Sequence, residues 1–265
     1  MSADNVLLAV PNISEGRDQE KVARIAGADP ALLDIHSDVD HNRSVLTYGG
    51  DPEAIEAEVA AMIERAVREL DLREQQGAHP RFGVVDVLPF VPYSVQEDVA
   101  LKAATGLVWT TAETSGVPIH FYERAAEDRR TLPQLRRWLR ETNPPVHPSA
   151  GVICVGVRDP LIAFNVNIEG SLDDALRVAS EIRSDDIRAL GFELPSRGLA
   201  QVSMNLVALH QTGPAKAHEA VASLVDAIVD CEIVGLVPNH VLKELKTVPL
   251  REPVRSVEQA LDTIR

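Results

Sequence analysis

Residues 44–70 read SVLTYGGDPEAIEAEVAAMIERAVREL and contain a strand, a turn and a helix in succession. The apolar run Ser44–Tyr48 predicts a strand, which Gly49-Gly50 ends. Asp51 is suited to cap a helix that has Pro52 at its first position. Apolar residues then recur every three or four positions, as on the buried face of a helix: Ile55, Val59, Met62, Ile63, Ala66, Val67 and Leu70. We therefore expect this helix to pack against the sheet that the strand enters.

The flanking segments extend this unit on both sides. The elements expected around it are strands at 6–10, 32–35, 84–91 and 117–122 and helices at 17–28 and 96–114. The first six elements follow the order β-α-β-β-α-β, which is typical of a ferredoxin-like unit.

The same order of elements is predicted a second time, after a proline-rich junction at 143–148. Its elements are strands at 161–168, 189–194, 199–207 and 232–236 and helices at 172–183 and 215–229. We therefore expect an α+β fold of two ferredoxin-like subdomains, residues 1–148 and 149–265, with a ligand cleft between them.

The amino-acid composition argues against two classes of binding partner. The formal net charge is −14 and the basic residues are scattered, which argues against nucleic acid and acidic membranes as partners. The N-terminal residues MSADNVLLAVPN lack the basic region of a signal peptide, and no apolar run approaches the ~20 residues of a transmembrane helix. We expect a cytoplasmic protein that binds small molecules.

Two polar clusters follow the first two predicted strands. Asn12, Ser14 and Glu15 form the first, and ordinary turn and capping chemistry explains them as well as a binding site does. The second cluster comprises His36, Asp38, Asp40, His41, Asn42 and Arg43. Its alternating histidines and aspartates are typical of metal ligands, and a solvated acidic loop is the competing interpretation.

A third cluster, QQGAHPRFG at 75–83, directly precedes a predicted strand. Pro80 restricts the backbone of His79 to extended geometry and so directs its imidazole. An imidazole whose pKa lies near ~6.5 can both accept and return a proton at cellular pH. Arg81 and Asp86 lie nearby in the sequence and are suited to bind an anion and to orient the histidine. We interpret His79 as a general acid–base.

Amide side chains alternate with apolar residues in two strands of the second half. Asn165 and Asn167 lie in one, and Gln201, Ser203 and Asn205 lie in the other. Asparagine is disfavoured in strands, and amides offer both donors and acceptors to a ligand. A ligand-binding face and a plain polar sheet face are both consistent with this pattern.

Several of these runs, taken in order, resemble those of glutamate formiminotransferases. They are VPNISEGRD at 10–18, LLDIHSDVDHNRSVLTYGG at 32–50, GAHPRFGVVDVLPFVP at 77–92, ERAAEDRRTLP at 123–133, LIAFNVNI at 161–168, LAQVSMNL at 199–206 and VGLVP at 234–238. The resemblance extends from about Val6 to Leu242.

This resemblance implies transfer of a formimino group from N-formimino-L-glutamate to tetrahydrofolate, a co-substrate, in histidine breakdown. It also implies two α+β subdomains with a ligand tunnel between them and a homodimeric assembly. No metal is expected.

The resemblance also implies roles for single residues. His79 occupies the position of the family's catalytic histidine, which Asp38 or Asp40 would assist. The stretch 144–151 matches a segment that contacts folate in mammalian members. The residues expected to bind substrate or folate are Asn12, Ser14, Glu15, His36, Asn42, Arg43, Arg81, Pro145, His147, Pro148, Ser149, Gly151, Asn165, Asn167 and Asn205.

Two departures leave the donor and the assisting carboxylate open. Mammalian members carry an aspartate at the position of His36, and their segment between the equivalents of Arg130 and Asn143 is longer. The alternatives are a metal-dependent hydrolase that uses His36, Asp38, His41 and His79, and a catalytically silent folate-binding relative.

Overall fold

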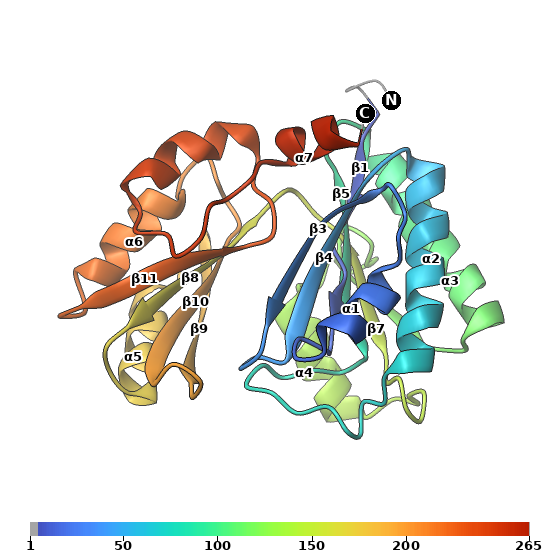
Figure 1. Ribbon diagram of the computed structural model, residues 1–265. Coiled ribbons are helices and arrows are strands. Elements are labelled where there is room, and N and C mark those ends of the chain that lie inside the picture. The colour runs from blue at the N-terminus through green and yellow to red at the C-terminus, as the bar shows by residue number, and fades with distance from the viewer. Residues whose placement is uncertain (1–4, 265) are drawn as a thin grey trace. The chain divides into compact units, whose positions relative to one another are not determined.

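The computed structural model describes residues 5–264, which divide into two compact units at the junction of Asp159 and Pro160 (Figure 1). We call them unit 1 and unit 2. Both contain sheets and helices, so the predicted α+β class is confirmed. The junction lies later than the predicted boundary after Pro148. The reason is that strand β7 (Ile153–Val157) pairs with strands of unit 1.

The sheet of unit 1 has seven strands in the spatial order β3-β4-β1/β2-β5-β7-β6. Besides β7 they are β1 (Leu7–Ala9), β2 (Asn12–Ile13), β3 (Leu32–Asp38), β4 (Arg43–Gly50), β5 (Val85–Pro92) and β6 (Ile119–Glu123). Both β1 and β2 lie between β4 and β5, as two parts of one strand interrupted at Pro11. Proline has no N–H for the strand ladder, which explains the interruption.

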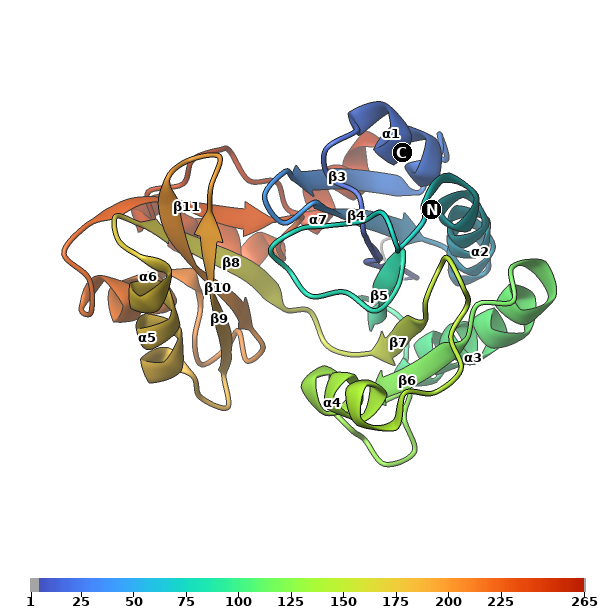
Figure 2. The same cartoon turned by 90° about the horizontal axis from the view of Figure 1, so that it is seen from below.

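The helices of unit 1 lie on both faces of this sheet. They are α1 (Gln19–Ala26), α2 (Pro52–Glu69), α3 (Glu97–Thr114) and α4 (Leu132–Thr142). Figure 1 shows α2 and α3 side by side on one face, where the apolar stripe of α2 is buried as predicted. Strand β7 alternates between the two faces: Ile153 and Val155 pack into the core below α2 and α3, and Cys154 packs against α4. Figure 2 shows α4 beside β6.

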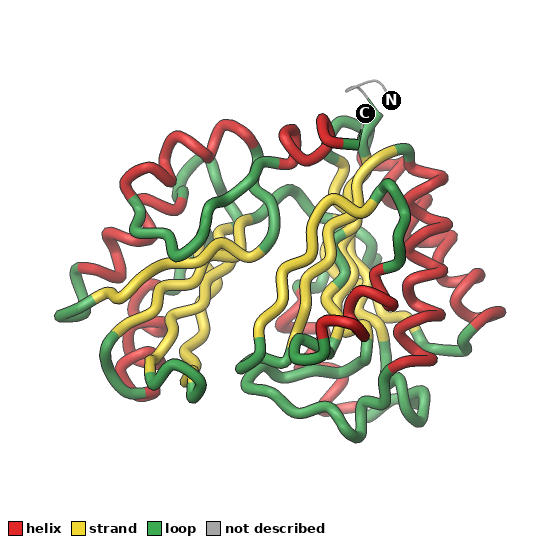
Figure 3. Tube along the Cα trace, viewed as in Figure 1, coloured by secondary structure: helices red, strands yellow, loops and turns green. Residues whose placement is uncertain are grey.

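Unit 2 repeats the element order β-α-β-β-α-β and adds short helices at its C-terminal end. The elements are β8 (Ile162–Ile168), α5 (Leu172–Ile182), β9 (Ile187–Leu194), β10 (Leu199–Leu206), α6 (Pro214–Ala222), β11 (Ile228–Val234), the 3₁₀ helix η1 (Asn239–Thr247) and α7 (Val257–Thr263). The strands are antiparallel in the order β9-β10-β8-β11, and α5 and α6 cover one face (Figure 3). Unit 1 contains the same arrangement in β3-β4-β1/β2-β5, when β1 and β2 are counted as one strand. No helix within the described residues is long and apolar enough to cross a membrane.

The helix predicted at 215–229 is wrong at its C-terminal end. Helix α6 ends at Ala222, and the N–H of Ser223 donates to the carbonyl of Glu219. The chain then enters β11, in which Ile228 pairs with Ile168 of β8. Apolar spacing alone cannot reveal this end, because pairing with a strand 60 residues away in the sequence determines it.

Helix α4 is not predicted from the sequence, although its N-terminus carries clear signals. Thr131 forms a capping box with Gln134, and Pro133 occupies an early position where its missing N–H costs nothing. Leu135 and Leu139 are its buried residues. This amphipathic helix therefore covers the face of the sheet opposite α2 and α3.

A β-bulge in β5 determines where Asp86 points. Asn12 pairs with Val87, but the next residue, Ile13, pairs with Val85, so Asp86 is an extra residue in β5. A bulge breaks the alternation of a strand and turns a side chain toward a new neighbour. Asp86 and Val87 consequently both lie on the α4 side of the sheet.

The carboxylate of Asp86 joins three parts of unit 1 and is fully buried. Its Oδ1 accepts a hydrogen bond from the N–H of Phe82 at 2.7 Å. Its Oδ2 accepts from Arg43 on β4 at 2.9 Å and from Arg136 on α4. Burial alone would raise the pKa of Asp86, but these three donors and their charges hold the pKa below its ordinary value.

We expect Asp86→Ala to destabilise unit 1 by about 3–5 kcal/mol, because it leaves buried arginines without their counter-charge. Urea unfolding followed by tryptophan fluorescence measures this effect in unit 1, since both tryptophans, Trp109 and Trp138, lie there. The control is Glu69→Ala, which removes a partly exposed ion pair between α2 and Arg24 of α1 and should leave the midpoint almost unchanged. Equal midpoints for the two variants would contradict the structural role of Asp86.

Candidate functional site

The loop between α2 and β5 presents His79, which is half-buried. Its Nδ1 lies 2.8 Å from the carbonyl oxygen of Pro80. A carbonyl oxygen only accepts hydrogen bonds, so the proton of the neutral ring resides on Nδ1. The other nitrogen, Nε2, is then the atom that can accept a proton from a substrate.

The surroundings of His79 favour its neutral form. Burial is the largest cause that brings its pKa well below 6.5, and the positive charges of Arg43 and Arg136 lower the pKa further. Asp86 and the hydrogen bond to the Pro80 carbonyl oppose these effects only in part. The imidazole is therefore unprotonated at neutral pH and suited to act as a base.

The β3–β4 turn fixes the loop that carries His79. The N–H of Ala78 donates to the carbonyl of Asp40 at 3.1 Å, and Nη2 of Arg81 donates to the carbonyl of His41 at 2.8 Å. Gly77 permits this approach, because a Cβ there would lie 2.2 Å from the carbonyl oxygen of His41. Arg81 thus directs donors at the backbone of the turn, whereas the sequence analysis expects it to bind a substrate carboxylate.

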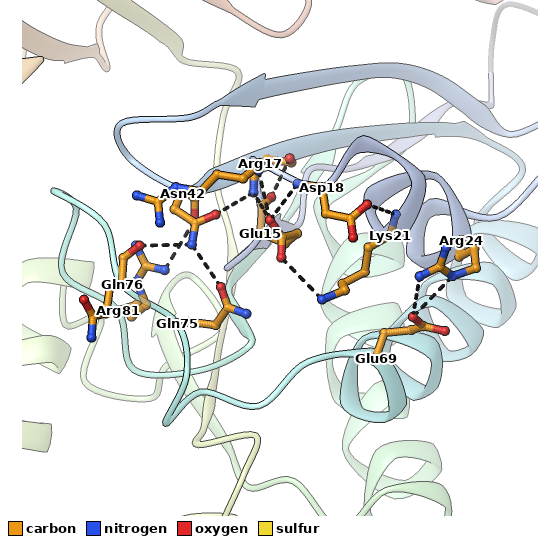
Figure 4. Close-up of polar contacts among 12 residues, drawn as sticks. Glu15, Arg17, Asp18, Lys21, Arg24, Asn42, Glu69, Gln75, Gln76 and Arg81 are labelled. Atoms are coloured by element: carbon orange, nitrogen blue, oxygen red, sulfur yellow. Dashed lines mark hydrogen bonds and ion pairs between the residues drawn. The ribbon is translucent and has the colours of Figure 1, made fainter. Parts of the chain in front are cut away.

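Asn42 links this turn to two other loops (Figure 4). Its Oδ1 accepts from the N–H of Gly16 at 3.0 Å, and its Nδ2 donates to the side chain of Gln75 and to the carbonyl of Gln76, both at 3.0 Å. Asn42 has φ +46°, a conformation that asparagine tolerates better than most residues. Its amide therefore stabilises the loops around His79.

Glu15 is a buried carboxylate in the loop just before α1 (Figure 4). Its Oε1 accepts hydrogen bonds from the N–H groups of Gly16, Arg17 and Asp18, at 3.0, 2.9 and 3.1 Å. These contacts satisfy donors that would otherwise lack partners next to the helix N-terminus. The neighbouring Ser14 is also buried and donates to the carbonyl of Gly83 at 2.8 Å.

The polar cluster at 36–43 is divided between strands and a turn. His36 lies in β3 opposite Val45, so part of the predicted polar loop is a strand. Asp38 ends β3, and its Oδ1 accepts from the N–H of His41 at 2.7 Å, which closes the turn. The His41 ring packs edge-on against the His79 ring, with centroids 6.2 Å apart.

Asn12 and Arg43 are direct neighbours in the structure. Asn12 Oδ1 accepts from Nε of Arg43 at 3.0 Å, and Nη1 of the same guanidinium donates to Asp86. Both Asn12 and Arg43 are predicted from the sequence to bind substrate or folate.

The segment 144–151 lies against the residues that follow His79. The backbones of His147 and Gly151 donate to each other, and Nδ1 of His147 accepts from the N–H of Ala150 at 3.0 Å. Gly151 then forms a β-bridge with Gly83. The carbonyl of Ser149 accepts from the N–H of Leu72, at the start of the loop that carries His79. The structure thus brings Ser149 and Gly151 into contact with that loop, and Pro145, His147 and Pro148 belong to the same segment.

The amides of unit 2 form a network within their own sheet. Asn165 donates to Glu232 at 3.0 Å, Asn167 donates to Asp230 at 2.7 Å, and Gln201 donates to Asn167 at 3.0 Å. These three amides are buried, whereas Asn205 is exposed.

Arginines complete this network in unit 2. Arg197 forms an ion pair with Asp230, and Arg251 forms one with Glu232. The amides are predicted from the sequence, but these four charged residues are not. Asp230 and Glu232 alternate with apolar residues in β11, which is the local signal that could have indicated both carboxylates.

Arg136 is the residue of unit 1 that sequence reasoning misses. It lies next to Leu135 and three positions before Leu139, at the edge of the buried stripe of α4. Because helix α4 itself is not predicted, this position could not be recognised. Among residues 5–264, no group of three or more His, Cys, Asp or Glu side chains could bind a metal ion.

Comparison with known proteins agrees with this division of the chain. A family model of the formiminotransferase domain's N-terminal subdomain matches residues 6–158, and a second model, of the formiminotransferase domain, matches residues 163–257. The junction of the two units lies in the short gap between these two matches.

Curated relatives match along most of the chain. A glutamate formimidoyltransferase of Thermoplasma acidophilum is 35% identical, over 88% of each chain. One of Streptococcus pyogenes is 32% identical, over 89% of this chain and 90% of the relative. The formimidoyltransferase-cyclodeaminase of Rattus norvegicus is 32% identical, over 88% of this chain and 50% of the relative. The chain belongs to the formiminotransferase family.

Proposed function

We propose that this chain is a glutamate formimidoyltransferase that transfers the formimino group of N-formimino-L-glutamate to tetrahydrofolate in histidine degradation. The main support is the 35% identity, over 88% of each chain, to a protein named glutamate formimidoyltransferase. The environment of His79 gives physical support, because it provides a neutral base among positively charged side chains.

The proposed reaction needs one proton acceptor. The formimino carbon of the donor is the centre of an amidinium and is electrophilic. Nitrogen 5 of tetrahydrofolate attacks this carbon and forms a tetrahedral intermediate, while Nε2 of His79 takes the proton of the attacking nitrogen. Collapse of the intermediate breaks the bond to the glutamate nitrogen, and His79 returns the proton to this leaving amine.

The lowered pKa of His79 suits both steps. The ring is neutral at the start and can accept a proton, and the imidazolium that forms is a stronger acid than an ordinary one. Alignment of two substrates beside this group supplies further acceleration through proximity. Asp38 or Asp40 is proposed to stabilise the cationic centre.

We assign the remaining predicted residues to the binding of folate and substrate. The segment 144–151 would contact folate, and its bridge to Gly83 supports a place near His79. The other residues proposed to bind substrate or folate, or to shape their sites, are Asn12, Ser14, Glu15, His36, Asn42, Arg43, Arg81, Asn165, Asn167 and Asn205.

We also propose that both units are ferredoxin-like and that the protein acts in the cytoplasm, where these metabolites are used.

His79→Ala should lower kcat by about 10²–10⁴-fold, the usual contribution of a positioned acid–base group. The folded state should be retained, because His79 lies in a half-buried loop outside the core. Steady-state assays with tetrahydrofolate and N-formimino-L-glutamate measure the change. His218→Ala, on α6, is the control and should keep full activity. A His79→Ala enzyme that turns over like the wild type would refute the mechanism.

The pH profile provides a second test of His79. The neutral ring is the active form, and burial together with nearby arginines lowers its pKa, so kcat/KM should fall only below pH 6.5. Measurement of kcat/KM between about pH 4.5 and 8 locates this limb. NMR titration of the His79 ring in the free protein provides the matched observation. An acidic limb at or above pH 6.5 would contradict the assignment.

We further propose a homodimer, as the family resemblance implies. Trp109 on α3 is 76% exposed and is therefore available to a contact with a second copy of the chain. Light scattering at micromolar concentration should therefore give about twice the monomer mass of 28.8 kDa. A mass close to that of the monomer would exclude the dimer.

A further inference from the structure

The charges around Asp86 do not balance. Arg43 and Arg136 both donate to one oxygen, Oδ2, of this single carboxylate. Two guanidinium groups therefore meet at one atom and leave one positive charge in excess. Asp86 also accepts from the N–H of Phe82, three residues after His79, which places this cluster beside the loop that carries His79. The positive charges of both arginines accordingly lower the pKa of His79. This local excess is notable in a chain of net charge −14.

Each of the two arginines keeps donors that no group among the described residues uses. In Arg43, Nε donates to Asn12 and Nη1 to Asp86, and Nη2 has no partner among residues 5–264. In Arg136, Nη2 donates to Asp86, while Nη1 has no partner in the described chain. Nε of Arg136 is buried and also lacks a hydrogen bond. A guanidinium presents five N–H donors, and charged donors without partners are costly when buried.

The two side chains are fixed before any ligand binds. Only 12% of the Arg43 side chain and 14% of the Arg136 side chain are exposed. Asn12 and Asp86 orient the first, and Asp86 together with the packing of α4 on the sheet orients the second. A pre-oriented, largely desolvated pair of guanidiniums matches the planar, bidentate geometry of a carboxylate.

We infer that Arg136 and Arg43 form a carboxylate-binding subsite beside His79, in which Arg136 is a specificity-determining residue. The inference rests on the proposed function only for the identity of the natural ligand, which is a carboxylate of the donor or of the glutamate tail of tetrahydrofolate. Arg81 is not part of this subsite, because its donors point at backbone carbonyls.

Calorimetric binding of glutarate tests the subsite without any catalysis. Glutarate carries two carboxylates, and glutaramide is its uncharged counterpart of similar shape. Wild type should bind glutarate and not glutaramide. Arg136→Gln should weaken glutarate binding by about 10–100-fold, the range expected for loss of a charged hydrogen-bonding partner. Unchanged binding would overturn the inference.

Arg137→Gln is the matched control, because Arg137 is the exposed neighbour of Arg136 on α4 and its loss removes the same charge. Equal weakening in both variants would show a general charge effect and overturn the subsite. Arg136→Lys keeps the charge at Asp86 and protects the fold, but it lacks the planar fork. It should bind glutarate several-fold more weakly than the wild type, and wild-type binding by this variant would also overturn the inference.

Steady-state kinetics of Arg136→Gln distinguish the two sources of the carboxylate. A raised KM for N-formimino-L-glutamate assigns the subsite to the donor, and a raised KM for tetrahydrofolate assigns it to the folate tail. Unchanged values of both would overturn a role in the reaction. A wild-type protein that transfers no formimino group contradicts the proposed function, whereas the glutarate measurements still decide the subsite.

Discussion

A negative charge buried at Asp86 is the constraint on which the arrangement of unit 1 depends. An isolated buried carboxylate would be very costly, so the fold must bring compensating donors to it. These come from β4, α4 and the chain just before β5, and they fix these parts relative to one another. The loop of His79 is thereby attached to the same centre, since Phe82 follows it by three residues. The contacts of Asp86 therefore both stabilise unit 1 and determine which charges lie near His79.

Much of the fold could be predicted because its signals are local. The capping residue, the early proline and the apolar stripe of α2 lie within one segment, and the helix forms where they predict it. The element order of unit 2 follows from similar signals. The end of α6 and the boundary between the units could not be predicted, because strand pairing between distant segments decides both. Helix α4 could have been predicted from its capping box, which is a local signal, although the predicted strands and helices did not include it.

The candidate site could also be predicted only in part from the sequence. His79, Asn42 and Arg43 stand out in sequence because polar residues cluster around each of them, and the structure brings these clusters together. What each side chain contacts is a long-range property. Asp86 meets arginines that precede it by 43 residues and follow it by 50 residues. Arg81 is directed toward the turn that contains His41, which no local pattern indicates. Residue type can suggest a role, but only the packed chain shows which charges remain unpaired.

The bulge in β5 also has an evolutionary consequence. Because Asp86 is an extra residue, Val85 lies in the core beneath α2 and α3, the next two residues face α4, and Leu88 and Phe90 return to that core. Deletion of the Asp86 codon would restore strict alternation and leave Leu88 and Phe90 in the core, but it would remove the buried carboxylate. Insertion of one codon between Val87 and Leu88 would instead move Leu88 and Phe90 to the opposite face. We therefore expect length changes in the loop before His79 to disturb the fold less than length changes in the few codons after it. The codons of β5 are therefore expected to be inherited without insertion or deletion.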